Sequence, residues 1–592
     1  MALEWDLTPL YDSFESEKFK EDLKKSSILV DEMKEWIDIN FNNHEDEVEK
    51  LENFMKKDLE LYSYQERLGA FIHLTLSTNS KNEPAIKNNA ILQAKRNELA
   101  GPMAKVNKWI AQIEDLATLL EKSSLLKEHN FYLSEIVANN AHSLSEKEET
   151  MLAKLKETGS SAWEDYKNLI ISTHKVEIEE EEGMKEYPLT VALNMAYDTD
   201  KKVRERAYHA EIASYKKIED GVAAALNGIK GEAISVCALR GYESPLEMTL
   251  NQSRMDRETL EAMLGAMRES FPKFRSYLRR KAELLGYNNG LPFYEMYAPV
   301  CDADMTYSYE DGQAFVEKQF RKFSENLGNY AVKAFDNHWI DVYPRAGKRG
   351  GAFCSTIRTI KESRFLLNYG NSFSDVITMA HELGHGFHGA CLNNESPFNT
   401  SYPMPLAETA STFCETIVKK AAIKEVDKKA AFSILETEIS DATQVIVDIY
   451  SRYLFETEVF EKRKVSPLTV EEIKNAMLNA QKEAYGDGLD PEYLHPYMWT
   501  WKPHYYFTTR NFYNFPYAFG LLFAKGLYAE YCKKPETFPE EYEKILALTG
   551  KNKIVDVTKA AGIDVHDIEF WKASLKTIEE DIDTFIKLSY EI

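Results

Sequence analysis

The sequence has little cysteine and no excess of positive charge. Its 592 residues include only six cysteines, which lie far apart without a Cys-x-x-Cys pair, so reduced thiols are expected rather than a disulfide scaffold. Lysine and arginine number 72 against 96 aspartates and glutamates, a formal net charge of −24. Because such a surface repels phosphates and anionic headgroups, we expect no nucleic-acid partner and no membrane partner.

Targeting signals, long apolar runs and repeats are also missing. Residues 1–8 carry acids where a secretory signal needs bases, and no later run of about 18 apolar residues could span a bilayer. We therefore expect a cytoplasmic protein. No repeat of roughly 20 to 50 residues is found, which argues against a solenoid. With 44% hydrophobic residues, the chain has ample material for a core.

Helical patterns dominate the chain. From residue 13 to about residue 158, apolar residues recur three and four apart and proline and glycine are scarce, which predicts a helical array. We expect an N-terminal helical lobe at residues 1–185 and a catalytic domain at residues 186–592. An acidic alternation at residues 175–183 favours a small ribbon or an exposed turn. Three short runs predict a small sheet, namely 339–343, 351–354 and 364–369.

Residues 371–390 carry the pattern that points most directly to chemistry. Ser372 with Asp375 resembles a capping box and predicts a helix start. On that helix His381 and His385 lie about 6 Å apart along the axis, so both imidazoles can reach one zinc ion at about 2.0 Å. Glu382 flanks that point and can accept a proton from water that the metal activates. This His-Glu-x-x-His arrangement predicts zinc-dependent peptide hydrolysis.

A catalytic zinc site needs a third protein ligand. His388 shares the helix face but lies about 10.5 Å along the axis from His381, too far to share one ion. Glu395 lies in a loop after this helix, whereas Glu408 opens a second helical run after Pro405. We expect Glu408 to complete the site. On the same face of that run, Thr412 and Glu415 are candidates for orienting a ligand or binding substrate, or belong to a solvated polar stripe.

His381-Glu-Leu-Gly-His385, followed by Glu408-Thr-Ala-Ser-Thr-Phe, resembles the thimet oligopeptidase and oligoendopeptidase F family of zinc metallopeptidases. The resemblance extends to residues 5–11, 344–353, 504–506 and 512–520, so it covers nearly the whole chain. It implies a mainly α, two-lobed, zincin-type fold with a deep substrate channel and a small β-sheet beside the zinc helix. It also implies one zinc ion held by His381, His385 and Glu408, and cleavage of internal bonds in short peptides.

Residues 493–531 are rich in aromatic side chains, with fifteen Tyr, Trp or Phe among 39 residues against 12% in the whole chain. Most are expected in the core, but tyrosine hydroxyls and His504 are suitable donors to the oxyanion of a tetrahedral intermediate. Comparison with the resembled family points to His504, Tyr513 and Tyr517 for this role.

Residues 347–351 are rich in glycine but do not match a phosphate-binding loop, which needs Gly at position 342 and Ser or Thr at 349, where Val342 and Arg349 stand. They resemble instead the family's loop beside the substrate. An extended peptide could add to the strand edge at residues 351–354. An ordinary hairpin turn is the alternative.

The sequence therefore predicts a cytoplasmic zinc endopeptidase that hydrolyses short oligopeptides with Glu382 as the general base. Two alternatives stay open. A helical zinc carboxypeptidase shares the same motif, and a peptide-binding or holdase protein would keep the cleft without turnover.

Overall fold

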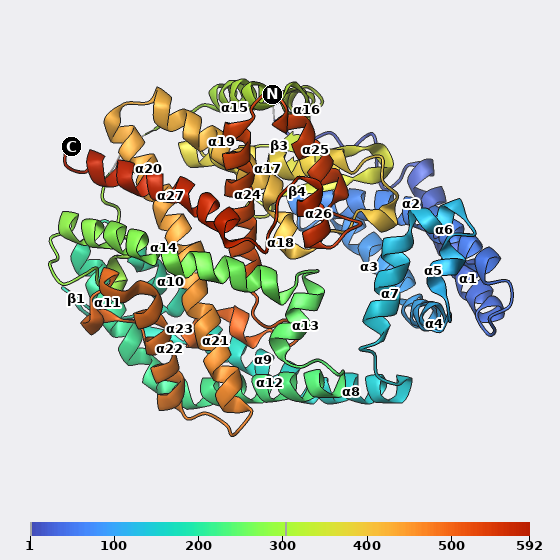
Figure 1. Ribbon diagram of the computed structural model, residues 1–592, viewed down its shortest axis with the longest axis horizontal. Coiled ribbons are helices and arrows are strands. Elements are labelled where there is room, and N and C mark those ends of the chain that lie inside the picture. The colour runs from blue at the N-terminus through green and yellow to red at the C-terminus, as the bar shows by residue number, and fades with distance from the viewer. Residues whose placement is uncertain (1–2, 302–304) are drawn as a thin grey trace.

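The fold is mainly helical, with two small sheets (Figure 1). It is known from a computed structural model that describes residues 3–301 and 305–592; the first two residues of the predicted N-terminal lobe lie outside this range. The N-terminal helices gather at one end of the molecule, coloured blue in Figure 1. They are α1 (Glu17–Asn40), α2 (Glu47–Thr78), α3 (Glu83–Asn97), α4 (Ala100–Ala111), α5 (Leu116–Leu120), α6 (Ser124–Glu128) and α7 (Asn130–Asn140).

These first helices form because polar caps precede amphipathic runs. Ser16 accepts a hydrogen bond from the Phe19 N–H at the start of α1, and Asn82 does the same for Ala85 at the start of α3. Leucine, isoleucine and aromatic side chains of α1, α2 and α4 to α7 form one shared core. A second cluster joins α1 and α2 to Ile357 and Leu366 of the small sheet. The N-terminal helices are therefore packed onto the sheet that precedes the predicted zinc helix.

The next part of the chain forms the lower body in Figure 1. The acidic alternation is an antiparallel ribbon, in which Lys175 pairs with Pro188. Its elements are α8 (Glu146–Thr158), α9 (Ser160–Thr173), β1 (Lys175–Glu180), β2 (Gly183–Pro188), α10 (Leu189–Asn194), α11 (Lys201–Ser214), α12 (Glu219–Leu239), α13 (Pro245–Gln252) and α14 (Arg257–Leu284). Val176 and Ile178 of β1 share a core with Leu226 of α12 and with residues from 455 to 506. The lobe division at residue 185 stays a prediction.

The third part holds the predicted sheet and zinc helix. Its elements are α15 (Tyr309–Phe323), α16 (Glu325–Asp336), β3 (Ile340–Asp341), β4 (Phe353–Ile357), β5 (Glu362–Leu366), α17 (Phe373–Cys391), α18 (Met404–Ala407) and α19 (Thr409–Glu425). The three predicted strands are confirmed with somewhat different bounds. Strand β5 lies in the middle, parallel to β3 through Ile340 and Phe365 and antiparallel to β4 through Cys354 and Phe365. Strand β4 is therefore an edge of this sheet.

The C-terminal helices complete the largest core. They are α20 (Lys428–Thr443), α21 (Ile449–Arg463), α22 (Val470–Tyr485), α23 (Met498–Trp501), α24 (Phe515–Lys533), α25 (Phe538–Leu548), α26 (Ile554–Ala560) and α27 (Ile568–Leu588), with a π-helical turn at Gln444–Asp448 between α20 and α21. Apolar side chains of α14, α17, α19, α20, α24 and α27 form one continuous core. Helix α17, the predicted zinc helix, thus has its apolar face fixed by elements far away in the sequence.

Helix α12 corrects one expectation from the sequence. By length and composition it is apolar enough to cross a membrane, and 44% of its most apolar window is buried. It nevertheless packs into the core that it shares with β1 and residues from 455 to 506. Its Lys230 makes a buried 2.6 Å ion pair with Glu456. We ascribe its apolar composition to this packing within the fold.

Candidate metal centre

Helix α17 presents the two motif histidines on one face. Ser372 and Asp375 form the predicted capping box, which fixes where the helix begins. The buried face includes Val376, Met379, Leu383 and Phe387, whereas His381 and His385 are partly exposed on the other side. Because they are one turn apart, their Nε2 atoms lie 3.1 Å from each other.

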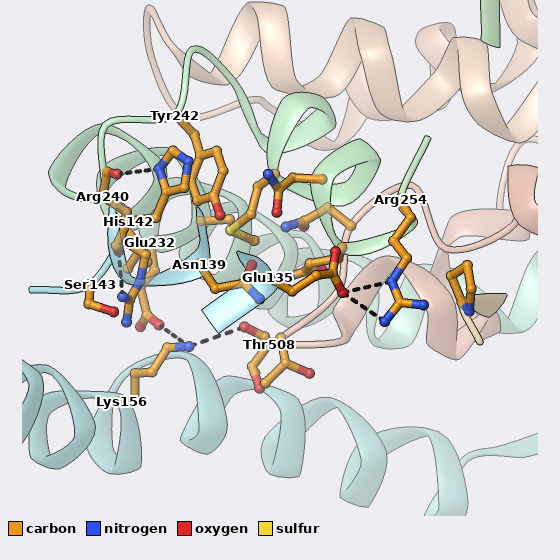
Figure 2. A pocket seen from close by; sticks show the side chains of 18 of the residues that line it. Glu135, Asn139, His142, Ser143, Lys156, Glu232, Arg240, Tyr242, Arg254 and Thr508 are labelled. Carbon is orange, nitrogen blue, oxygen red and sulfur yellow. Dashed lines mark hydrogen bonds and ion pairs between the residues drawn. The ribbon is translucent and has the colours of Figure 1, made fainter. Parts of the chain in front are cut away.

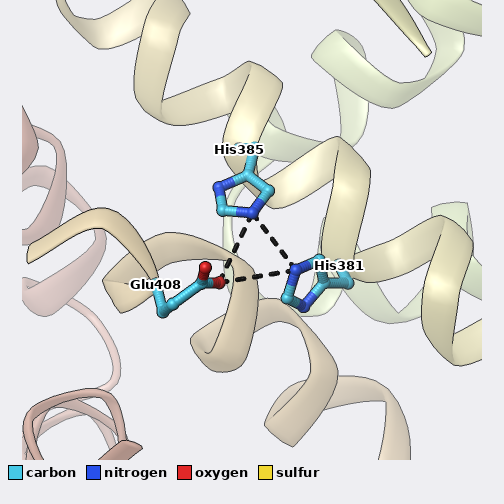
Figure 3. Close-up of side chains that lie close together, drawn as sticks. All are labelled: His381, His385 and Glu408. Carbon is cyan, nitrogen blue, oxygen red and sulfur yellow. Dashed lines mark hydrogen bonds and ion pairs between the residues drawn. The ribbon is translucent and has the colours of Figure 1, made fainter. Parts of the chain in front are cut away.

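Glu408 reaches the Nε2 atoms of His381 and His385 from the junction of α18 and α19. It follows the short helix α18 and is the residue immediately before α19. Its Oε2 atom lies 3.4 Å from His381 Nε2 and 3.4 Å from His385 Nε2. One ligand atom from each of the three side chains lies within 4.8 Å of the others. Figure 3 shows the three side chains pointing toward one another from α17 and the chain beside it.

Two glycines allow this approach. A Cβ atom on Gly384 would lie 2.7 Å from the carbonyl oxygen of Ala410 and 2.7 Å from Cα of Ser411, both backbone atoms of α19. On α24, a Cβ atom on Gly520 would lie 3.2 Å from Cβ of Glu408. The helical cost of Gly384, about 1 kcal/mol relative to alanine, is therefore explained by the close contact of α17 with α19. This contact sets the distance between the histidines and Glu408.

The two histidines differ in their electrostatic surroundings. Burial lowers the pKa of His385 to about 4, which keeps its imidazole neutral near pH 7. Burial opposes protonation of His381 as well, but its hydrogen bond to Glu415 and the surrounding carboxylates raise its pKa. A neutral imidazole with a lone pair is the form that binds a metal. A divalent cation in the cluster would replace the proton that these carboxylates attract to His381.

The two alternative ligands considered from the sequence lie elsewhere. His388 is fully buried, its Nε2 atom is 2.8 Å from Thr549 Oγ1, and its ring stacks on Tyr402 at 4.2 Å. Glu395 forms a 2.5 Å ion pair with Lys551. Neither belongs to the cluster of His381, His385 and Glu408.

Glu382 lies beside the cluster at a cavity of about 880 Å³. Only 6% of the residue is exposed, and burial raises the pKa of its carboxyl to about 7. The same cavity is lined by His381 and by Ala352, which directly precedes the edge strand β4. A carboxyl with a pKa near 7 can take up and release a proton in the physiological range.

A chain of buried ion pairs lies behind His381. Glu415 Oε1 accepts a 2.6 Å hydrogen bond from His381 Nδ1, and its other oxygen is 2.9 Å from Lys419 Nζ. Lys419 also pairs with Glu438 at 2.5 Å, and Glu438 pairs with Lys525 at 2.6 Å. Although burial alone would raise it, Lys419 and His381 lower the pKa of Glu415 to about 2. Glu415 is therefore a permanent anion that orients His381.

Sequence reasoning proposed Glu415 but missed Lys419, Glu438 and Lys525. Lys419 follows Glu415 by four residues on one helix, a spacing that indicates an ion pair. Glu438 and Lys525 come from α20 and α24, so no local pattern connects them to His381.

The aromatic segment contributes a third group of side chains. Tyr517 lines a cavity with His381 and Glu408, and its hydroxyl donates a 3.0 Å hydrogen bond to that of Tyr513. The ring of His504 stacks on Tyr513 at 4.9 Å, and its Nδ1 atom lies 3.2 Å from Asn514 Nδ2. Burial lowers the pKa of His504 to about 4. Tyr517 therefore shares a cavity with Glu408, Tyr513 contacts Tyr517, and His504 contacts Tyr513.

A separate cavity of about 620 Å³ lies between the N-terminal helices and the body of the molecule (Figure 2). Its charged side chains are largely paired. Arg254 forms a 2.7 Å ion pair with Glu135 of α7 and donates a hydrogen bond to the Ser401 carbonyl oxygen, while Lys156 of α8 donates one to the Thr508 carbonyl oxygen. These contacts connect α7 and α8 to the loops at residues 401–403 and 508–511.

Comparison with known proteins identifies the family of this chain. The sequence pattern of peptidase family M3 matches residues 194–577, more than half of the chain, and that of oligopeptidase F matches residues 110–175. The chain belongs to peptidase family M3. It is 25% identical to oligopeptidase PepF of Bacillus subtilis over 481 residues, 80% of this chain and 71% of the relative. Membership of family M3 makes the chain a metallo-endopeptidase, as the sequence predicted.

Solved structures agree with the M3 fold. A crystal structure from Chlamydophila abortus matches with a TM-score of 0.87 at 22% identity, covering 99% of this chain and 98% of that one. Oligoendopeptidase-F from Enterococcus faecium matches with a TM-score of 0.68 at 19% identity, covering 97% and 99%. At these identities the likeness concerns the fold alone, and it confirms the predicted mainly α architecture.

Proposed function

We propose that the protein is a zinc-dependent endopeptidase that hydrolyses internal bonds of short oligopeptides. The observation that carries the proposal is the convergence of His381, His385 and Glu408, whose ligand atoms lie within 4.8 Å of one another. Two imidazole nitrogens and one carboxylate oxygen are a ligand set typical of catalytic zinc, and three protein ligands leave a position open. These residues therefore fit a single zinc ion. When bound there, zinc supplies a Lewis acid that polarises a carbonyl and acidifies water.

Glu382 is the proposed general base. Its carboxylate lines the same cavity as His381, and burial gives it a pKa of about 7. It accepts the proton of the attacking water and delivers it to the nitrogen of the leaving amine. Glu415 holds His381 through Nδ1, so that Nε2 faces the cluster.

Tyr517, Tyr513 and His504 are the proposed hydrogen-bond donors to the negative charge that develops on the carbonyl oxygen. Tyr517 is the nearest candidate because it shares a cavity with Glu408. Tyr513 is hydrogen-bonded to Tyr517 and stacked on His504. Besides donating themselves, Tyr513 and His504 would hold the Tyr517 side chain in place through these contacts.

The edge strand β4 is the proposed docking site for the peptide backbone. It is hydrogen-bonded to β5 on one side only. Ala352, just before this strand, lines the cavity that contains Glu382. An extended peptide paired with β4 would gain backbone hydrogen bonds without requiring a particular sequence. A preference for short peptides would follow if the walls of this cavity exclude longer chains. We also propose the division into two lobes at residue 185 and a cytoplasmic location.

Digestion of peptides blocked at both ends and graded in length, with and without a chelator, tests this function. An endopeptidase cuts doubly blocked peptides at internal bonds, and chelation stops the reaction. Cleavage restricted to peptides with a free carboxyl end would identify a carboxypeptidase. Tight binding without products would identify a peptide-binding protein, and mass spectrometry of the products distinguishes all three.

A further inference from the structure

A further cavity, of about 480 Å³, includes Tyr297, whose hydroxyl contacts Gln444 in the π-helical turn after α20. We call it the aromatic cavity. Its walls come from α10, α11, the segment around residue 295 and α23. Side chains that define it include Tyr197, Phe293, Tyr294, Tyr297, Trp501 and Lys502.

Lys502 is the unusual member of this cavity. Its Nζ atom lies 4.3 Å from the centre of the Trp501 ring. Among the residues that the structure describes, no hydrogen bond or ion pair reaches this ammonium. The neighbouring indole N–H of Trp501 is likewise buried without a hydrogen-bond partner. Burial, together with the nearby cation of Arg452, lowers the pKa of Lys502 to about 8, although the carboxylates of Asp448 and Glu211 act in the opposite direction.

The other charged side chains that line the aromatic cavity, Arg204 and Glu211, are ion-paired or hydrogen-bonded. Arg204 forms a buried 2.6 Å ion pair with Glu295. Glu211 accepts hydrogen bonds from Tyr215 at 2.7 Å and from His495 at 2.9 Å. Among the residues that the structure describes, Lys502 is therefore the charged side chain of this largely aromatic cavity that no hydrogen bond or ion pair holds. An unpaired, partly desolvated cation costs stability, and its retention is explained if a ligand supplies the missing anion.

Helix α20 and the π-helical turn after it relate the aromatic cavity to the active-site cavities. Asp441 of α20 lines both cavities that contain His381. One turn later, Gln444 accepts a 3.0 Å hydrogen bond from the hydroxyl of Tyr297. Tyr197 stacks on Tyr297 at 4.8 Å, is 60% exposed at the mouth, and has its pKa raised by partial burial and by the carboxylate of Asp441. The end of α20 and the turn after it therefore adjoin both the active-site cavities and the aromatic side chains Tyr197 and Tyr297.

We propose that the aromatic cavity binds a carboxylate of the peptide substrate, paired with Lys502, together with the aromatic or large apolar side chain next to it. The inference rests on the proposed function for its ligand class and extends it to a second anchoring point. A carboxylate of this kind is either the C-terminus of a peptide that ends in an aromatic residue or an acidic side chain beside one. An anchor for the peptide end would also favour short substrates over long chains.

Equilibrium binding to the full-length protein tests the proposal. The probes are three N-acetylated peptides of one sequence: one ending in Phe as the free acid, one ending in Phe as the carboxamide, and one carboxamide with Glu after the Phe. Calorimetry is done with a chelator present, so that no probe is hydrolysed. Because no turnover is needed, the result is independent of whether the zinc endopeptidase assignment holds, which hydrolysis without chelator tests separately.

We expect the wild-type protein to bind the free acid about tenfold more tightly than the Phe carboxamide, because one carboxylate–ammonium contact is lost. Tight binding of the Glu carboxamide would assign the carboxylate to a side chain, and weak binding would assign it to the C-terminus. Lys502→Met is expected to bind all three probes equally, and Lys502→Arg to keep the preference. The matched control is Lys201→Met, which removes the same charge from an exposed position on α11 and should leave the preference unchanged.

Thermal unfolding separates binding from folding. Since no hydrogen bond or ion pair holds the Lys502 ammonium among the described residues, Lys502→Met is expected to unfold at or above the wild-type temperature. Equal affinity of the wild-type protein for all three probes would overturn the proposal, and this comparison requires no variant. A preference for the carboxylates that persists in folded Lys502→Met would overturn the role of Lys502.

Discussion

At the scale of single residues, charge and burial give the two neighbouring residues of the motif different tasks. His381 is held by an anion that does not titrate near neutral pH, because Lys419 lies 2.9 Å from Glu415. Glu382 has no such cation, and burial leaves its pKa near 7. One side chain is therefore oriented for a metal, while the next one along the helix is suited to carry a proton.

Replacement of the proposed base tests this assignment. Glu382→Gln preserves the shape but removes the proton acceptor, so we expect turnover of a quenched peptide to fall by about 10²- to 10⁴-fold. Zinc content, measured by elemental analysis, should stay at the wild-type level. Glu395→Gln, in the loop after the same helix, is the control and should retain activity. Near-normal turnover by Glu382→Gln would refute the general base.

The depressed pKa of Glu415 predicts a pH-dependent stability. Its pKa is about 2 in the folded protein against 4.5 for the unperturbed group, so the folded state favours the ionised carboxylate. This stabilisation is complete above pH 4.5 and is lost as the pH falls toward 2. With a chelator present, the melting temperature of the wild-type protein should exceed that of Glu415→Gln near pH 6. The difference should shrink below pH 4.5, and a constant difference would contradict the account.

At the scale of secondary-structure elements, the metal centre depends on the contact between α17 and α19. Helix α17 supplies both histidines, and Glu408 stands directly before α19. Gly384 is the point where the two helices touch most closely, with the α19 backbone 2.7 Å from where its Cβ would be. The spacing of the ligands is therefore a property of helix packing as well as of the motif.

A methyl group at this contact should disturb the site without changing any ligand. Gly384→Ala forces α19 away from α17, and we expect zinc affinity to fall by about 10- to 100-fold, as when ligand orientation is lost. The measurement is zinc competition with a chromogenic chelator. The control is Gly101→Ala in α4, where an added Cβ meets no atom within 4 Å and alanine favours the helix. Unchanged zinc affinity in Gly384→Ala would contradict the packing argument.

Elements with strong local signals could be predicted from the sequence. Ser372 and Asp375 predicted the first turn of α17, and the apolar spacing that includes Val376 and Leu383 predicted its buried face. The aromatic runs near residues 340, 353 and 365 predicted the strands. The strand bounds were less accurate, because the ends of strands depend on their partners. Glu408 reaches the histidines, whereas Glu395 pairs with Lys551. The path of the loop between α17 and α18 determines this difference, and the sequence did not predict that path.

At the scale of the whole molecule, the site is assembled from segments that are distant in the sequence. Lys419 is paired with Glu438 of α20, which is paired with Lys525 of α24. At a separate cavity, Glu135 of α7 contacts Arg254 and Lys156 of α8 contacts the carbonyl oxygen of Thr508 (Figure 2). Such contacts cannot be predicted from one sequence, because no local spacing relates their members. For the same reason, the position of Lys502 at the aromatic cavity became evident only in the fold.

The central claim is that Glu408, rather than Glu395, completes a zinc site with His381 and His385. Elemental analysis of the wild-type protein, Glu408→Ala and Glu395→Ala after identical dialysis tests it most directly. The account predicts one zinc ion per chain in the wild-type protein and in Glu395→Ala, and loss of zinc in Glu408→Ala, as in His381→Ala. Full zinc content in Glu408→Ala would contradict it.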